Sequence, residues 1–215
     1  MHTTSMRRTF MPVVAAMLAF AIASVAEAQQ GSRDGDRGTT VNLRGQVTAF
    51  SGSMLTVTTA DGDTLSMTVP KSARISSLTR IDFSELKQGD FIASAGMRQN
   101  DGTLKAIDVR VFPASGPRPP EVHRRFHLGP ESTMTNATVD AFIGGISGRT
   151  FKVKYKGGEQ TIVVPEDAPV MRQERGTAAL LKPGVHVSLV GRKDGDGNVS
   201  VVRMAVGMNG LVPPT

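Results

Sequence analysis

Two histidines in the segment 121–127 have a spacing that can support metal chemistry. His123 and His127 are four residues apart, which in a helix places both imidazoles on one face, where they can chelate a transition metal. Arg124 and Arg125 stand between them and repel a cation, and the sequence fixes no third ligand. We therefore expect a solvated basic linker, with metal binding through His123 and His127 as an alternative. No cofactor is expected.

The segment 151–156 is the second candidate, because lysines alternate in it with apolar residues. In a strand, Phe151, Val153 and Tyr155 face a core while the lysines line the outer face. Such a face can follow a polyanion, although lysines on a strand also protect it against edge pairing. Together with two arginines of the linker, the candidate binding residues are Lys152, Lys154, Lys156, Arg124 and Arg125.

Catalytic patterns are not found. The chain has no cysteine, no G-x-S-x-G elbow and no phosphate-cradling glycine loop, and His186 stands alone in an alternating segment. Asp194–Asn198 resembles a calcium loop, but Val199 occupies the place of the sharp-turn glycine and Ala205 that of the bidentate glutamate. We expect a plain turn there, no catalytic residues and a protein that is not an enzyme.

The amino terminus has the features of an export signal. Arg7 and Arg8 precede the apolar stretch Met11–Ala26, and Ala26-Glu27-Ala28 matches a signal-peptidase site. We expect cleavage after Ala28, a periplasmic mature chain and no membrane span thereafter. The arginine pair leaves the general secretory and twin-arginine routes both open. The formal net charge of +6 favours anionic partners.

The chain repeats itself. Three motifs recur in the same order and at the same offset along the chain, which predicts one domain encoded twice. They are Leu86-Lys87-Gln88-Gly89 with Leu181-Lys182-Pro183-Gly184, Val69-Pro70 with Val164-Pro165, and Asp101-Gly102 with Asp196-Gly197.

Alternation of apolar and polar residues between glycine turns predicts antiparallel strands in each copy. The expected order is three strands, a short helical or irregular crossover at 82–86 or 177–181, and two more strands. This is the order of the five-stranded OB-type barrel. The predicted fold is all-β, with two tandem small OB-like barrels joined by a proline-rich linker. The expected parts are a signal peptide (1–28), a disordered tether (29–41), a first barrel (42–112), the linker (113–133), a second barrel (134–208) and a tail (209–215).

Turn and core motifs of this chain are similar to those of a family of bacterial exported domains. The second copy departs from them, with Thr138-Val139 lacking a preceding glycine and Val185 in place of Asp90. The chain thus resembles the domain-of-unknown-function family 5666. The resemblance implies a small OB-like β-barrel and brings no functional residues. The motif residues are Gly45, Gln46, Val47, Leu86, Lys87, Gly89, Asp90, Asp101, Gly102, Leu104 and Ala106.

These observations favour a non-enzymatic, exported binding or scaffolding protein of the bacterial cell envelope. The alternatives are a polyanion binder, for nucleic acid or lipopolysaccharide, and a periplasmic metal-binding protein. The expected partner is an envelope protein or a polyanion. Features present in one copy only, the lysine segment 151–156 and the histidine segment 121–127, are where a specific function is to be sought.

Overall fold

A computed structural model describes residues 38–145 and 148–214. The predicted signal peptide and most of the predicted tether lie outside these residues. The described chain is all-β, with 55% of it in strands. Two short 3-10 turns, Phe83–Glu85 (η1) and Ala178–Leu180 (η3), lie inside the two segments where the sequence predicts a crossover.

In the part of the chain that the structure describes, no helix is long and apolar enough to cross a membrane.

The strands form one continuously hydrogen-bonded sheet of 14 strands within the described residues. Those of the first copy are β1 (Thr39–Ser51), β2 (Met54–Thr59), β3 (Thr64–Thr68), β4 (Arg74–Arg80), β5 (Phe91–Arg98), β6 (Leu104–Ala106) and β7 (Val109–Val111). After them come β8 (Val122–Arg125), β9 (Ser132–Ile143), β10 (Thr150–Tyr155), β11 (Gly158–Val163), β12 (Val170–Arg175), β13 (His186–Lys193) and β14 (Val199–Gly207).

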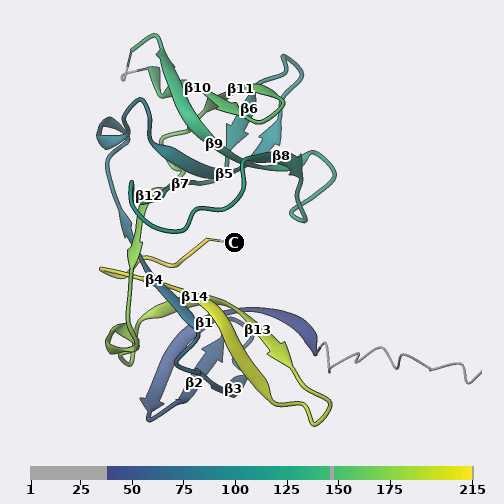
Figure 1. The fold of residues 1–215 in the computed structure, drawn as a ribbon, viewed down its shortest axis with the longest axis vertical. Helices are drawn as coiled ribbons and strands as arrows, with labels where there is room; N and C mark the ends of the chain where they lie inside the picture. The colour runs from purple at the N-terminus through teal and green to yellow at the C-terminus, as the bar shows by residue number, and fades with distance from the viewer. Residues whose placement is uncertain (1–37, 146–147, 215) are drawn as a thin grey trace, which may run out of the picture. The chain divides into compact units, whose positions relative to one another are not determined.

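The two sequence copies exchange their halves. β1 pairs with β2 on one side and with β13 of the second copy on the other, and β13 pairs in turn with β14. Correspondingly, β9 of the second copy pairs with β10 and with β5 of the first copy. Figure 1 shows β1, β2 and β3 beside β13 and β14. We call β1, β2, β3, β13 and β14 the first strand group, and β5, β6, β7, β9, β10 and β11 the second strand group.

The exchange is reciprocal and follows the repeat. In parallel pairing, Val109 of β7 lies opposite Val170 of β12, and Met204 of β14 lies opposite Ile75 of β4. Val109 corresponds to Met204, and Ile75 corresponds to Val170. Both correspondences have the same offset as that between Val69-Pro70 and Val164-Pro165. The pairing of β1 with β13 and that of β9 with β5 correspond in the same way. The two strand groups are therefore built alike from opposite halves.

β4 and β12 carry the chain from one strand group to the other. They pair antiparallel with each other, from Met171 opposite Arg80 to Arg175 opposite Ser76, and each also pairs with a strand of one group. The sequence pattern predicts neither strand, because the alternation of apolar and polar residues breaks in both segments. The partly buried Ser76 and Ser77 give β4 a weak pattern, so tertiary pairing rather than local preference makes it a strand.

Each strand group has its own core, drawn from both copies. The first combines Val57 and Met67 with Leu189 and Val201, and the second combines Ile92 with Phe151 and other residues of the opposite copy. A third, small cluster of Leu78, Met171 and Ala205 lies at the exchanged strands. The expected boundaries 42–112 and 134–208 thus delimit sequence repeats, but neither range contains a complete core. Barrel closure of these groups is not shown.

Bulges adjust which residues face the cores. The register of β1 on β2 shifts between Val47 and Ala49, so that Ala49 is exposed and Phe50 packs on the first core. A matching shift on β9 and β10 places Phe142 against the second core. Unbroken alternation from Val47 would turn Ala49 inward, but the bulge adds one residue on that strand and Phe50 turns inward instead.

The predicted linker and tether are more ordered than expected. Residues 122–125, expected to form at most a turn of helix, form strand β8 and pair with β9. Thr39–Val41, placed by the sequence in the disordered tether, begin β1 and pair with β13. Pairing with a neighbouring strand satisfies backbone groups that the sequence alone leaves to water.

Candidate anion-binding cleft

A cleft of about 2130 Å³ is lined by residues of both strand groups, of β4 and β12, and of the segment 112–127. Its charged lining has one sign almost throughout. Glu174 is the one acidic residue of this lining among the described residues. The cationic lining residues are Arg44, Lys71, Arg74, Arg110, Arg118, Arg124, Arg175 and Arg203.

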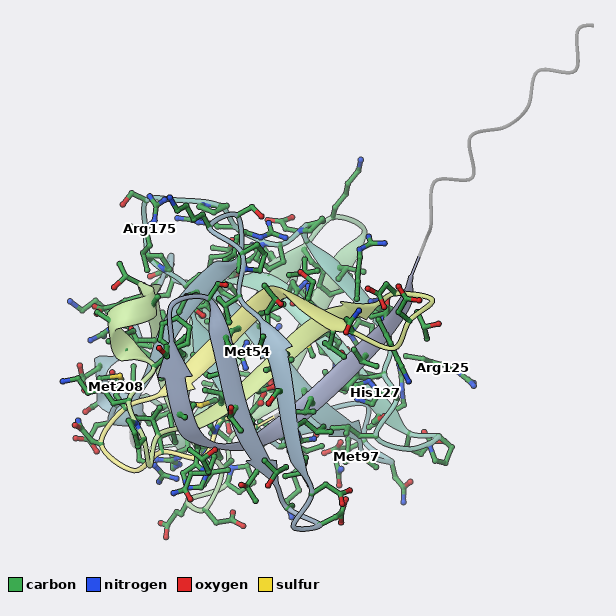
Figure 2. All side chains as sticks on the ribbon, turned by 90° about the horizontal axis from the view of Figure 1, so that it is seen from below. Met54, Met97, Arg125, His127, Arg175 and Met208 are labelled. Carbon is green, nitrogen blue, oxygen red and sulfur yellow. The ribbon has the colours of Figure 1, made fainter. Side chains whose placement is uncertain are left out.

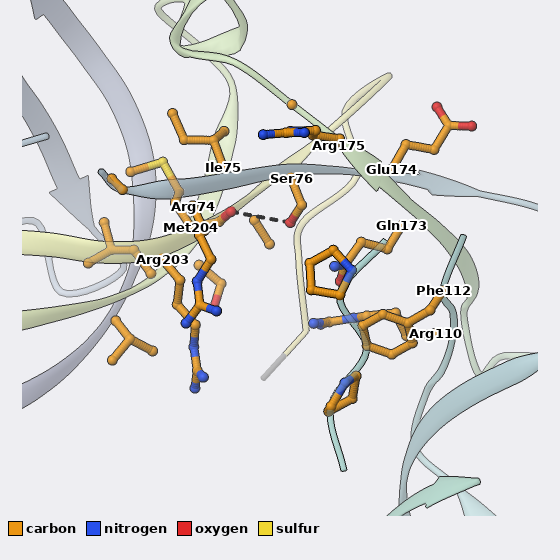
Figure 3. A pocket seen from close by; sticks show the side chains of 18 of the residues that line it. Arg74, Ile75, Ser76, Arg110, Phe112, Gln173, Glu174, Arg175, Arg203 and Met204 are labelled. Atoms are coloured by element: carbon orange, nitrogen blue, oxygen red, sulfur yellow. Dashed lines mark hydrogen bonds between the residues drawn. The ribbon is translucent and has the colours of Figure 1, made fainter. Parts of the chain in front are cut away.

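Arg74 and Arg203 are neighbours across two parallel strands. Arg203 of β14 is the register partner of Arg74 of β4, and both side chains are exposed to the cleft. Figure 3 shows them extending alongside each other. Adjacent strands are only about 4.8 Å apart, and like charges directly opposite each other destabilise a sheet. The hydrogen bond from Ser76 Oγ to the Met204 carbonyl, 3.2 Å, holds the two strands together at this point.

Arg110 approaches the same place from β7 and is less exposed. Its side chain lies beside Phe112 (Figure 3). Burial lowers the pKa of the Arg110 guanidinium, Asp108 acts in the opposite direction, and the nearby charge of Arg203 lowers it further. An arginine keeps its proton under all ordinary conditions. Arg110 thus lines the same cleft as Arg74 and Arg203.

Asp108 is the buried carboxylate nearest this cluster. Its Oδ1 accepts a hydrogen bond from the Ala95 N–H at 3.1 Å, and its own carbonyl accepts one from Ser94 Oγ at 2.7 Å. Burial raises the pKa of Asp108, whereas the Ala95 N–H and the charge of Arg110 lower it. Between the described residues, ion pairs within 4.0 Å are Lys152–Glu159, Lys154–Asp140 and Arg172–Glu85. None of them involves an arginine of the cleft, so its positive charge is largely uncompensated.

Apolar and proline side chains complete the walls. Phe112 and Phe126 line the cleft with prolines of the linker. Arg118 lies over the Phe91 ring at 5.5 Å, and its guanidinium donates a hydrogen bond to the Ala114 carbonyl at 2.7 Å. These contacts hold part of the linker in place beside the arginines. The cleft can thus accept an anion that carries an apolar part.

The lysine segment lies elsewhere and is partly neutralised. Phe151 and Val153 of β10 are buried, as the alternation predicts. On the outer face, Lys152 contacts Glu159 at 3.3 Å and Lys154 contacts Asp140 at 3.0 Å. Lys152, Lys154 and Lys156 do not line the cleft.

The two candidate arginines of the linker separate. Arg124 of β8 lines the cleft, whereas Arg125, which follows it on the strand, is exposed and does not line it. Figure 2 shows the Arg125 side chain extending away from the ribbon. The structure therefore brings one of the five candidate binding residues, Arg124, to the arginine-lined cleft.

The histidine pair lacks the helical geometry on which chelation depends. His123 lies in strand β8, which ends at Arg125, and His127 lies in the turn beyond it, so the two imidazoles do not share a helix face. The His123 ring stacks on Tyr155 at 5.5 Å, and its Nδ1 shares a hydrogen bond with Thr135 Oγ1 at 2.9 Å. Burial, and then the charge of Arg98, lowers the pKa of His123. His127 packs instead on Phe126, at 4.2 Å.

Potential metal ligands do not gather elsewhere in the described chain. No group of three or more His, Asp or Glu side chains with metal-binding proximity occurs among residues 38–145 and 148–214. The Asp194–Asn198 loop is a turn held by its own aspartate, as predicted. Asp194 Oδ1 accepts the Asn198 N–H at 2.8 Å and the Asp196 N–H at 3.1 Å. His186 lies half-buried in β13, as its alternating segment predicts.

Sequence reasoning missed the arginines that matter most here. Arg74, Arg110 and Arg203 are far apart in the chain and carry no motif. A signal was nevertheless present in the repeat, because the corresponding positions of the other copy hold Pro169, Ala205 and Asp108. Each arginine occurs in one copy only, and such differences between copies are where specific function is expected.

Comparison of the chain with family models, curated proteins and solved structures gives no match. The resemblance to the exported-domain family therefore rests on the turn and core motifs alone.

Proposed function

We propose that this chain is an exported, non-enzymatic binding protein and that its ligand is an anion held in the arginine-lined cleft. The observation that carries the proposal is the charge of the lining, eight cationic side chains against one carboxylate. Such a surface raises the local concentration of anions and speeds their association. Arginine donates hydrogen bonds but does not exchange protons near neutral pH, so this lining is suited to binding rather than to acid–base catalysis.

The site of export rests on the amino-terminal pattern. Arg7, Arg8 and the small residues before Gln29 support secretion, and anionic polymers and lipids are abundant in a bacterial envelope. The proposal therefore places the protein in the periplasm with an envelope polyanion as its partner. Lipopolysaccharide and nucleic acid both remain within this ligand class.

The cleft replaces the lysine face as the main binding surface. Lys152 and Lys154 already have carboxylate partners, and an anion would have to compete with Glu159 and Asp140 for them. Exposed ion pairs of this kind contribute only about 0.2–1 kcal/mol, so they can open, but they reduce the net charge of the face. The arginines of the cleft have no such partner among the described residues.

The test compares two double variants that remove the same charge. Arg74→Ala/Arg203→Ala removes two cations from the cleft, and Lys152→Ala/Lys154→Ala removes two cations from the lysine segment 151–156. Binding of a fluorescent heparin oligosaccharide, measured by anisotropy at low salt, should fall at least tenfold for the arginine variant and less than threefold for the lysine variant. Affinity of the wild type should also fall steeply with added salt. Equal losses, or no wild-type binding at low salt, contradict the proposal.

A further inference from the structure

We propose that Arg74, Arg110 and Arg203 form a subsite for a phosphoryl group with two negative charges, such as a terminal phosphate monoester. This inference rests on the proposed function, because it identifies the chemical group that the cleft binds most tightly. The three side chains come from three strands, β4, β7 and β14. Two belong to the first sequence copy and one to the second.

The first step is geometric. Arg74 and Arg203 are register partners on parallel strands, and their side chains run alongside each other (Figure 3). Arg110 is close enough to feel the charge of Arg203. Each guanidinium offers a planar pair of N–H groups that matches two oxygens of a phosphate. Three such groups can together surround the three free oxygens of a phosphate monoester.

The second step is charge balance. Against the three guanidiniums stands the buried carboxylate of Asp108, whose charge acts on Arg110 and whose Oδ1 is already bonded to the Ala95 N–H. The local excess is therefore two positive charges. A phosphate monoester carries about 1.5 to 2 negative charges at neutral pH, whereas a phosphodiester, a sulfate ester or a carboxylate carries one. Of these four groups, only the phosphate monoester can neutralise the two excess positive charges of the three arginines and Asp108.

The third step is the comparison between copies. The repeat places other residues at the positions that correspond to the three arginines. Pro169 corresponds to Arg74, Ala205 to Arg110 and Asp108 to Arg203. The fold is built on both sets of residues, so it does not require the arginines. Retaining like charges on adjacent strands is unfavourable for the sheet. Binding of an anion removes that cost.

The apolar wall indicates where the rest of the ligand lies. Phe112 is next to Arg110, and Phe126 lines the same cleft. A phosphate that ends a lipid or a phosphorylated sugar would place its organic part there. Free phosphate shares the anionic chemistry but makes no use of this wall, so the two sources can be separated by experiment.

The experiment measures binding to the whole mature chain by calorimetry and by vesicle sedimentation. The soluble probes are inorganic phosphate, pyrophosphate and dimethyl phosphate, a diester with one negative charge. The vesicles contain either phosphatidic acid, which ends in a phosphate monoester, or phosphatidylglycerol, which carries a diester. We expect inorganic phosphate to bind at least tenfold more tightly than dimethyl phosphate, and phosphatidic acid vesicles to bind better than phosphatidylglycerol vesicles. Binding of soluble phosphate without any vesicle preference identifies free phosphate as the ligand and still supports the subsite.

Conservative variants separate hydrogen-bond geometry from charge. Arg203→Lys keeps the charge but loses the fork, and should weaken phosphate binding about tenfold while heparin binding changes less than threefold. Lys152→Arg is the matched control and should change neither. If dimethyl phosphate and inorganic phosphate bind equally, or if Arg203→Lys binds phosphate as the wild type does, the subsite is refuted even though heparin binding upholds the anion-binding cleft. If heparin also fails to bind the wild type, the proposed function falls with it.

Discussion

In the first strand group, β14 presents Arg203 beside Arg74, and both face the cleft. In the second, β6 and β7 together correspond to β14, and Asp108, which lies between them, turns inward to accept the Ala95 N–H. The two groups share their strand order, their bulges and their pairing with β4 and β12. One position thus serves a buried hydrogen bond in one group and an exposed cation in the other.

The difference between the two groups indicates which residues can vary without altering the fold. Turn glycines and core positions agree between the copies because both strand groups have the same arrangement of strands and turns. Gly102 and Gly197, for example, have φ values of 82° and 90°, which favour glycine in both hairpins. Residues facing the cleft are not bound by that requirement. The cleft is therefore the region where two otherwise similar halves have become different.

The largest expected effect comes from disulfide cross-links that test the exchange of halves, because each disulfide either forms or does not form. The chain has no cysteine, so an introduced pair is the only one present. Thr40→Cys/Arg192→Cys joins register partners of β1 and β13, and should form an intramolecular disulfide on mild oxidation. Thr40→Cys/Met97→Cys tests the unexchanged arrangement, since Met97 corresponds to Arg192 in the first copy. Intact mass before and after oxidation should show bond formation in the first variant only.

Matched core truncations test whether the two groups depend on each other. Leu55 and Phe151 are both fully buried, one in each core. We expect Leu55→Ala to cost about 2–5 kcal/mol and Phe151→Ala about 3–5 kcal/mol of unfolding free energy. Because each core contains strands of both copies, either change should shift one common transition in urea. Two separate transitions, of which only one moves, would show that the groups unfold independently.

Asp108 should make stability depend on pH, and Arg203 should not. Burial raises the pKa of Asp108 above its ordinary value of 3.8, so the folded chain holds the proton that the unfolded chain has released. Stability therefore falls as pH rises from 3.8 toward the folded pKa, by at most about 1.4 kcal/mol per pH unit, and is constant above it. Asp108→Asn keeps an oxygen for the Ala95 N–H and should flatten this part of the profile. The measurement is urea unfolding between pH 4 and pH 8 (about one point per unit). A slope that persists in Asp108→Asn would assign it to another group.

The smallest effect is expected from giving the first group the residue of the second. Arg203→Asp replaces a like-charge pair with an ion pair to Arg74, and should raise stability by about 0.2–1 kcal/mol. The same variant should lose anion binding, because it turns the local excess of positive charge into near balance. Thermal unfolding and heparin anisotropy, measured on one sample, give both values. Lower stability together with intact binding would show that position 203 does not face the anion.

Much of the secondary structure could be predicted from sequence, because its causes are local. Alternation placed Phe151 and Val153 inward, and Asp-Gly pairs marked the hairpins. The crossovers were expected where η1 and η3 lie. The failures have non-local causes. β4, β8 and β12 become strands through their partners.

The candidate site was less accessible to sequence reasoning. The lysine segment was conspicuous because its charges are contiguous, yet the structure pairs two of its lysines with acids. The arginines of the cleft are separated by tens of residues and meet only through strand pairing. Of the site residues named in advance, Arg124 and the metal-binding candidate His127 lie at the cleft.

The sequence by itself determined that the chain is all-β, that it is a duplicated unit, and where most strands and turns lie. These properties follow from short-range periodicity and from glycines at positive φ. Only the tertiary structure decided which copy pairs with which. Both copies follow one plan, so β1 can accept either β5 or β13, and local pattern cannot distinguish them. In the exchanged arrangement β4 pairs with β12, and Arg74 of β4 lies opposite Arg203 of β14 in the cleft that Arg110 also lines.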